Sequence, residues 1–195
     1  MKKFRIVTTS FLLSICHLTL YGQTITDTNV HFGMAGNTLH RFQSVDGGGS
    51  GEDRLSYLAG VQVGFGLTEK LTLVSGIDYA RHNLTVVSAP MPEQRSTDGH
   101  ITTLSFPLGI KWNIGRWFFI QGGPSLDVQP TKWEAVDNQN GIGLYAAIGG
   151  RYALGKWSLS LTPSVKQYAL ISFGDGSYPQ RLLTAGALLA VGYEF

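Results

Sequence analysis

Apolar and polar residues alternate along the last thirteen positions of the chain, 183–195. Every second side chain there is apolar, and the row ends on two aromatic rings: Leu183, Ala185, Ala187, Leu189, Val191, Tyr193 and Phe195. Most of the intervening side chains are small or polar, with Leu188 as an exception. Successive side chains of a strand point to opposite faces, so the pattern predicts a strand with one apolar face. A membrane barrel needs an apolar outer face and a small or polar inner face, and the opposite row, rich in Gly and Ala, fits the inner one.

The same alternation recurs in seven earlier segments of the chain. These are 30–42, 55–67, 71–82, 101–114, 117–128, 142–154 and 157–171. In 101–114, for example, Leu108, Ile110 and Trp112 alternate with smaller or polar residues. With 183–195 they make eight strands, and single-chain bacterial barrels use an even number. The chain is therefore predicted to be all-β: an eight-stranded antiparallel up-and-down transmembrane β-barrel.

The connections between these segments alternate strictly in length. Three are tight, around Thr68–Lys70, Gly115–Arg116 and Gly155–Lys156. Four are long and polar: 43–54, 83–100, 129–141 and 172–181. Outer-membrane barrels have short periplasmic turns and longer external loops. We therefore expect the termini and tight turns to be periplasmic and the long loops to be extracellular.

Aromatic residues are predicted to gather outside the barrel near its tight turns. The belt would consist of Phe32, Phe65, Trp112, Phe118, Tyr152, Trp157, Tyr193 and Phe195. Amphipathic rings at this height are expected to lie among lipid headgroups. Pro107, Pro124 and Pro163 fit the scheme less well, because proline lacks a ladder donor, and local bulges are expected to accommodate them.

The amino terminus has the pattern of an export signal. Lys2, Lys3 and Arg5 precede a short apolar core, and Gly22 suits cleavage before Gln23. This predicts a signal peptide over 1–22 and a barrel domain over 23–195. Cys16, the single cysteine, falls inside the signal; it could accept a lipid, although Ile15 before it is bulky. The mature chain would then have neither disulfides nor a thiol nucleophile.

Composition excludes several functional classes. The net charge of +2 is too small to indicate a nucleic-acid partner. No stretch of about eighteen apolar residues could form a spanning helix. A membrane protein of this composition must then be a barrel.

Two segments are similar to a known family. Segment 104–112, LSFPLGIKW, joins an apolar–Pro–apolar strand to basic and aromatic residues, and 122–126, GGPSL, follows as a Gly-rich strand. With the export signal, they resemble the small PorT-like outer-membrane β-barrel proteins of Bacteroidota. The resemblance implies an outer-membrane location, and one branch of the family serves assembly of a secretion system. It carries over no functional residue.

The inward rows of the predicted strands contain an unusual set of charges. They are Asp78, Lys111, Asp127, Arg151, Lys166 and Glu194. Counting from the tight turns places Lys111, Arg151 and Glu194 low in the lumen and the others higher, with Arg41 near the top. An eight-stranded lumen is only wide enough for side chains, so these charges must pair. We expect a structural plug and negligible conductance; the alternative is a narrow porin-like channel.

Three histidines, His40, His82 and His100, are expected near the external rim as solvated side chains. Metal binding and catalysis are the alternatives. Some eight-stranded barrels are lipid A-modifying enzymes with a His-x-Ser pair, but no histidine here has Ser two places later, and His100-Ile-Thr102 comes nearest. No catalytic, cofactor or metal residues are therefore assigned.

The sequence thus favours a non-enzymatic outer-membrane barrel that is structural or binds partners through its external loops, for example in secretion-system or envelope assembly. Expected partners are outer-membrane lipid, the barrel-assembly machinery through the C-terminal strand, and an unidentified envelope protein. A lipid-modifying enzyme is one alternative. A soluble lipocalin-like carrier is another, but it would need an apolar interior.

Overall fold

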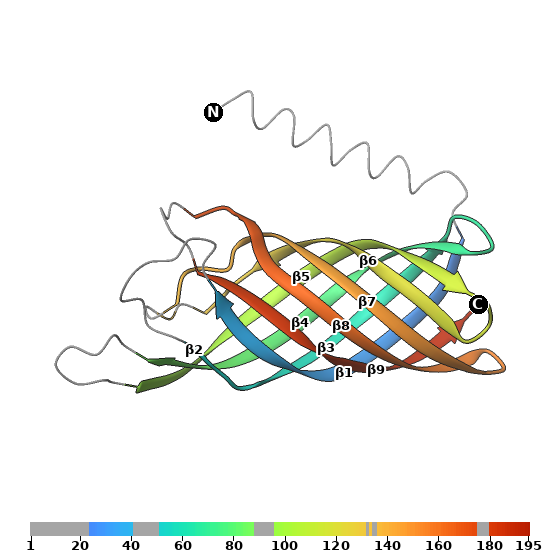
Figure 1. The fold of residues 1–195 in the computed structure, drawn as a ribbon. Helices are drawn as coiled ribbons and strands as arrows, with labels where there is room; N and C mark the ends of the chain where they lie inside the picture. Colours follow the sequence, from blue (N-terminus) through green and yellow to red (C-terminus); the bar gives the residue numbers. More distant parts are fainter. Residues whose placement is uncertain (1–23, 41–50, 88–95, 132, 134–135, 175–179) are drawn as a thin grey trace, which may run out of the picture.

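The computed structural model describes residues 24–40, 51–87, 96–131, 133, 136–174 and 180–195. Its strands are β1 (Ile25–His40), β2 (Gly51–Asp53), β3 (Leu55–Gly66), β4 (Leu71–Val87), β5 (Ser96–Ile114), β6 (Phe118–Val128), β7 (Gly141–Leu154), β8 (Trp157–Ser172) and β9 (Arg181–Glu194). Eight of them form one antiparallel ring, β1–β3–β4–β5–β6–β7–β8–β9, with β9 paired back to β1. Figure 1 shows the resulting tilted barrel, which confirms the predicted fold.

Within the described residues, no helix is long and apolar enough to cross a membrane. The predicted signal peptide 1–22, Cys16, Arg41 and the side chain of His40 lie outside the described part of the chain.

Three strands are longer than the sequence pattern predicts. β1 begins at Ile25 rather than at residue 30. β4 and β5 continue as a paired hairpin as far as Val87 and Ser96, so most of the expected loop 83–100 is strand. The three residues of β2, in the expected loop 43–54, pair with the same extension of β4. The extensions contain polar residues and lack the apolar–polar alternation from which strands were predicted, because a strand beyond the apolar band needs no apolar face.

The tight turns lie at the same end of the barrel as the C-terminus and the start of β1 (Figure 1). This end is called the turn end, and the opposite one the loop end. Gly115 and Gly155 adopt φ values of 67° and 65°, a left-handed conformation that glycine accepts without steric cost. In the third turn, Thr68 Oγ1 accepts hydrogen bonds from the amides of Lys70 and Leu71.

Side chains alternate between the wall and the lumen as the sequence indicates. On β5, Phe106, Leu108 and Trp112 are 40–51% exposed on the outer wall. Between them, Gly109 and Lys111 are buried on the inner face. The barrel therefore presents its large apolar groups outward and its small or polar groups inward.

The expected bulges at the three prolines are wrong. Next to Pro107, the pairing of β4 with β5 is interrupted for two residues on each strand, between Ser75↔Leu108 and Asp78↔Ser105. The register is the same on both sides of this gap. Gaps of the same kind flank Pro124 and Pro163. Each proline thus removes a ladder donor without inserting a residue.

Candidate functional site

Four ion pairs cross the lumen, and each joins strands that are not neighbours in the ring. Near the turn end, Lys111 Nζ of β5 lies 2.8 Å from Asp27 Oδ2 of β1. Arg151 Nη1 of β7 lies 2.9 Å from Glu194 Oε1 of β9. Because these pairs skip at least one strand, they brace the barrel from inside.

A third pair lies further along the lumen. His31 Nε2 of β1 is 3.0 Å from Asp78 Oδ1 of β4, and the His31 side chain is 8% exposed. Gly60 on β3 faces this pair. A Cβ there would contact Asp78 Oδ1, and it would lie 2.5 Å from His31 Nε2. The missing side chain at residue 60 therefore makes room for the pair.

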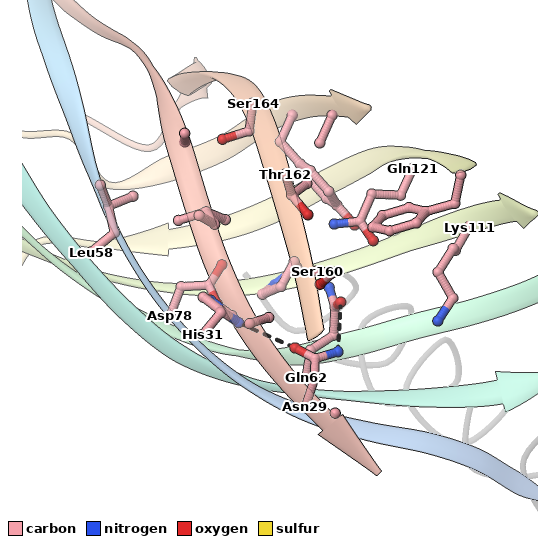
Figure 2. Close-up of a pocket in the computed structure, with 18 of the residues that line it drawn as sticks. Asn29, His31, Leu58, Gln62, Asp78, Lys111, Gln121, Ser160, Thr162 and Ser164 are labelled. Carbon is pink, nitrogen blue, oxygen red and sulfur yellow. Dashed lines mark hydrogen bonds and ion pairs between the residues drawn. The ribbon is translucent and has the colours of Figure 1, made fainter. Parts of the chain in front are cut away.

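A cavity of about 90 Å³ occupies the turn-end part of the lumen. A water molecule needs about 10–15 Å³ of such volume, so the cavity accommodates roughly six to nine. Figure 2 shows Asn29, Gln62, Lys111 and Gln121 around it, together with hydroxyl groups of β8. Those hydroxyl groups belong to Ser158, Ser160, Thr162 and Ser164. Apolar side chains, including Leu58 and Phe119, line the rest of the wall, so the cavity is mixed in character and its polar groups can hydrogen-bond water.

The ion pairs differ in exposure. The side chains of Glu194 and Arg151 are 37% and 24% exposed. Asp127, which pairs with Lys166 at 3.0 Å, is completely buried. The cavity is lined by the partly exposed pair Arg151–Glu194 and by Lys166, the partner of Asp127.

Asp127 is the centre of a dense polar contact network. Its Oδ1 accepts a hydrogen bond from Ser125 Oγ at 3.0 Å, and its Oδ2 accepts one from the amide of Ala169 at 3.3 Å. Ala169 has a φ of 43°, which is uncommon for a residue with a side chain. It lies in the bulge where β7 and β8 change register. The amide contact with Asp127 helps to hold this conformation.

Beyond Asp127, buried polar groups fill the lumen. His82 Nδ1 lies 3.0 Å from Ser56 Oγ and 3.2 Å from Asn37 Oδ1, and its Nε2 lies 3.0 Å from Thr103 Oγ1. All four side chains are at most 1% exposed. The expectation of a solvated rim histidine is therefore wrong for His82, whereas His100 is exposed.

An apolar cluster closes the loop end of the lumen. It consists of Leu84, Ile101, Val136, Tyr168 and Leu182, with Leu39 and Trp133 packed against it. The ring of Tyr168 also lies 5.0 Å from that of His82 and 4.5 Å from Lys166 Nζ. We call the loop-end seal the set formed by this cluster, Asp127, and His82 with its contacts Ser56, Asn37 and Thr103.

The chain after β6 folds over this cluster and is fixed by amide side chains. Gln139 is completely buried. Its Nε2 donates to the carbonyl of Gln180 at 3.0 Å, and its Oε1 accepts from the amide of Leu182 at 3.0 Å. Gln129 Oε1 accepts from the amide of Gln139 at 2.9 Å. Part of the expected loop 129–141 is thus an ordered cover rather than a free loop.

The six lumen charges assigned from sequence all lie inside the barrel. Arg151 meets Glu194, and Lys166 meets Asp127. Lys111 and Asp78 instead pair with Asp27 and His31, which sequence reasoning missed. Asp27 precedes the predicted segment 30–42, and His31 lies at its start. A period-two count carried back from Ala35 would have placed both on the inward face.

The aromatic residues predicted for the belt lie on the outer wall, and all except Phe32 lie near the turn end. Tyr193 makes edge contacts with Trp157 and Phe195, at 5.2 and 5.3 Å between ring centroids. Trp117, not assigned to the belt, stacks on Tyr152 at 5.6 Å. Phe32 pairs with Leu189 and lies further from the turn end, because β1 begins earlier than expected. Trp112 and Phe118 are exposed at the turn end, and Phe65 is half-buried there.

The site offers little to a metal ion or a substrate. Among the described residues, no three His, Cys, Asp or Glu side chains gather as a metal-binding group. Ser56 and His82 have the contact of a nucleophile and its base, but both are completely buried. A substrate could reach them only if the loop-end seal opened.

Searches against protein-family models and curated protein sequences find no match. Among solved structures, the chain is similar to outer membrane protein AlkL, with a TM-score of 0.50 and 11% identity over 89% of this chain and 92% of AlkL. It is also similar to OprG from Pseudomonas aeruginosa (TM-score 0.45, 13% identity, 89% and 98% covered). For Ail of Yersinia pestis the values are 0.47, 9%, 88% and 100%. At these identities the AlkL likeness concerns the fold alone, an eight-stranded outer-membrane barrel.

Proposed function

We propose that this protein is a non-enzymatic outer-membrane barrel that works through its loop-end segments and its outer wall. The observation that carries the proposal is the loop-end seal. Asp127, His82 and Leu182 are completely buried there, and Gln139 holds the segment after β6 against Leu182. A lumen filled in this way leaves the outer surfaces as the places where partners can bind.

The outer wall supports a membrane location. Its large side chains are apolar and strongly exposed, for example Val30 at 62%, Ile148 at 60% and Leu161 at 56%. Four ion pairs lie inside the barrel. A soluble lipocalin-like carrier would have the opposite distribution. We propose further that the signal peptide 1–22 exports the chain and that the barrel-assembly machinery recognises β9.

The proposed orientation has termini and tight turns in the periplasm and loops outside the cell. It follows the rule that outer-membrane barrels have short periplasmic turns. Loops on a rigid scaffold are common binding elements, so an envelope protein is the proposed partner. The resemblance of 104–112 and 122–126 to PorT-like proteins favours a role in secretion-system or envelope assembly.

Fractionation of the native envelope tests the location. We expect the protein to need detergent for release and to migrate faster on a gel before heating than after. Release in the soluble fraction would contradict a membrane barrel and favour the carrier.

Crosslinking in the intact envelope, followed by affinity purification and mass spectrometry, tests the partner role. An envelope protein that crosslinks to loop-end positions supports it, and crosslinking to lipid alone contradicts it.

A lipid A-modifying enzyme is the competing function. Expression in a Gram-negative host, followed by mass spectrometry of lipid A, separates the two. We expect unchanged lipid A masses. A mass shift that disappears in His82→Ala or His100→Ala would contradict the non-enzymatic proposal.

A further inference from the structure

Each tight turn of the barrel presents one exposed basic residue beside a tryptophan. The basic residues are Lys70, Arg116 and Lys156. Their neighbouring tryptophans are Trp112, Trp117 and Trp157, which are 51%, 51% and 57% exposed. Trp117 and Trp157 directly follow Arg116 and Lys156, whereas Trp112 lies on β5 and pairs with Leu71, the residue after Lys70. We call these six residues the turn-end rim.

Of the three cations, Lys156 contacts an aromatic ring, and Arg116 and Lys70 are linked to their tryptophans through the backbone. Lys156 Nζ lies 5.7 Å from the centre of the Tyr193 ring, which also meets Trp157 edge-on at 5.2 Å. Arg116 directly precedes Trp117, which stacks on Tyr152. The carbonyl of Lys70 accepts a hydrogen bond from the amide of Asn113, next to Trp112.

The cations of the rim have few acidic neighbours. In the lumen, each of the three basic side chains has a carboxylate partner. Among the described rim and turn residues, Glu69 is the one exposed carboxylate side chain. With the terminal carboxylate of Phe195, which lies at the same end (Figure 1), two negative charges face three cations, so the turn end keeps a small excess of positive charge.

We infer that the turn-end rim binds the phosphate groups of anionic phospholipids, such as phosphatidylglycerol, in the leaflet at that end. This inference rests on the proposed membrane location. Exposed tryptophans at a barrel end lie at headgroup height, and basic side chains extend from there toward phosphate. Attraction to anionic lipid follows from the charge excess. A lipid is favoured over free phosphate because the apolar wall continues directly beside each cation.

Fluorescence quenching by brominated lipids tests this inference. The chain has four tryptophans, and in Trp133→Phe the remaining three all belong to the rim. This variant is reconstituted into phosphatidylcholine vesicles that contain a minor fraction of brominated phosphatidylglycerol or brominated phosphatidylcholine. We expect a preference for phosphatidylglycerol of about fivefold, equivalent to about 1 kcal/mol, that declines with added salt.

Two further variants locate the effect. K70Q/R116Q/K156Q in the same background should remove the preference. Arg81→Gln, which changes an exposed arginine on the outer wall of β4 away from the turns, should leave it unchanged. Native mass spectrometry of the phosphatidylglycerol retained by the otherwise unmodified chain repeats the comparison without replacing Trp133.

Several results would overturn the inference. Equal quenching by the two lipids in the parent protein would do so. A preference that survives the triple replacement, or one that Arg81→Gln also removes, would show that the rim is not its source. Quenching by neither lipid would instead contradict the proposed membrane location, and the rim site with it.

Discussion

Lys111 Nζ lies 2.9 and 2.8 Å from the two carboxylate oxygens of Asp27, a residue 84 positions earlier in the chain. The side chains are 8% and 14% exposed, and they connect β5 with β1 across the lumen. A pair this enclosed loses much of its hydration, so each member depends on the other.

Removal of one partner should cost more than removal of both. Lys111→Met and Asp27→Asn should each lower the free energy of unfolding by about 3 kcal/mol, because each leaves the other member of the pair as a buried charge without its partner. The double variant should lose less than either single variant, and so clearly less than their sum. Urea titration in lipid vesicles measures these changes. Glu69→Gln, in an exposed turn and outside the turn-end rim, is the control; strict additivity of the two lumen changes would contradict their coupling.

Two glycines of β7 should respond differently to alanine. A Cβ at Gly143 would contact Asp127 Oδ2 and would lie 2.7 Å from the carbonyl of Gln167, whereas a Cβ at Gly150 meets nothing within 4 Å. Gly143→Ala should therefore destabilise the barrel by about 1–3 kcal/mol. Gly150→Ala should change stability by less than about 0.5 kcal/mol. Similar effects at both positions, measured by the same urea titration, would argue against the tight packing around Asp127.

His82 should matter for stability, and His100 should not. His82→Ala leaves the buried hydroxyls of Ser56 and Thr103 without their imidazole contacts, which should cost about 2–3 kcal/mol. His100→Ala changes an exposed side chain, so its effect should stay within about 0.5 kcal/mol. The temperature at which the folded gel form disappears compares the two. Equal temperatures for both variants would contradict the buried role of His82.

The cover of the loop end should depend on Gln139. Gln139→Ala removes the acceptor of the Leu182 amide, and an unsatisfied buried amide costs about 1–3 kcal/mol. Hydrogen exchange at a peptide that contains Leu182 should become roughly five- to a hundredfold faster, which is the rate change that corresponds to this free energy. Asn138→Ala, which loses one exposed contact to the Asn140 amide, is the matched control. Unchanged exchange in Gln139→Ala would show that other contacts hold the cover.

The ring of strands could be predicted from sequence because lipid and lumen impose opposite demands on alternate residues. Leu108, Ile110 and Trp112 must face the wall, and Lys111 between them must face inward. The extension of β4 beyond Arg81 could not be predicted in this way, because strands outside the apolar band carry polar residues on both faces.

The candidate site was predictable in composition but not in pairing. Inward periodicity places Asp127 and Lys166 in the lumen, but strand stagger decides which cation meets which carboxylate. Gln139 belongs to no strand, so periodicity says nothing of its position. Its burial depends on the amides of β9 that it meets.

Closure of the lumen is tested most directly by recording currents from purified protein in planar bilayers. Because Asp127, His82, Tyr168 and Leu182 are at most 1% exposed, the folded protein should produce negligible conductance across a range of voltages. Gel mobility before heating verifies that the recorded protein is folded. Sustained discrete channels from the folded parent protein would contradict the closed lumen and support a narrow pore instead.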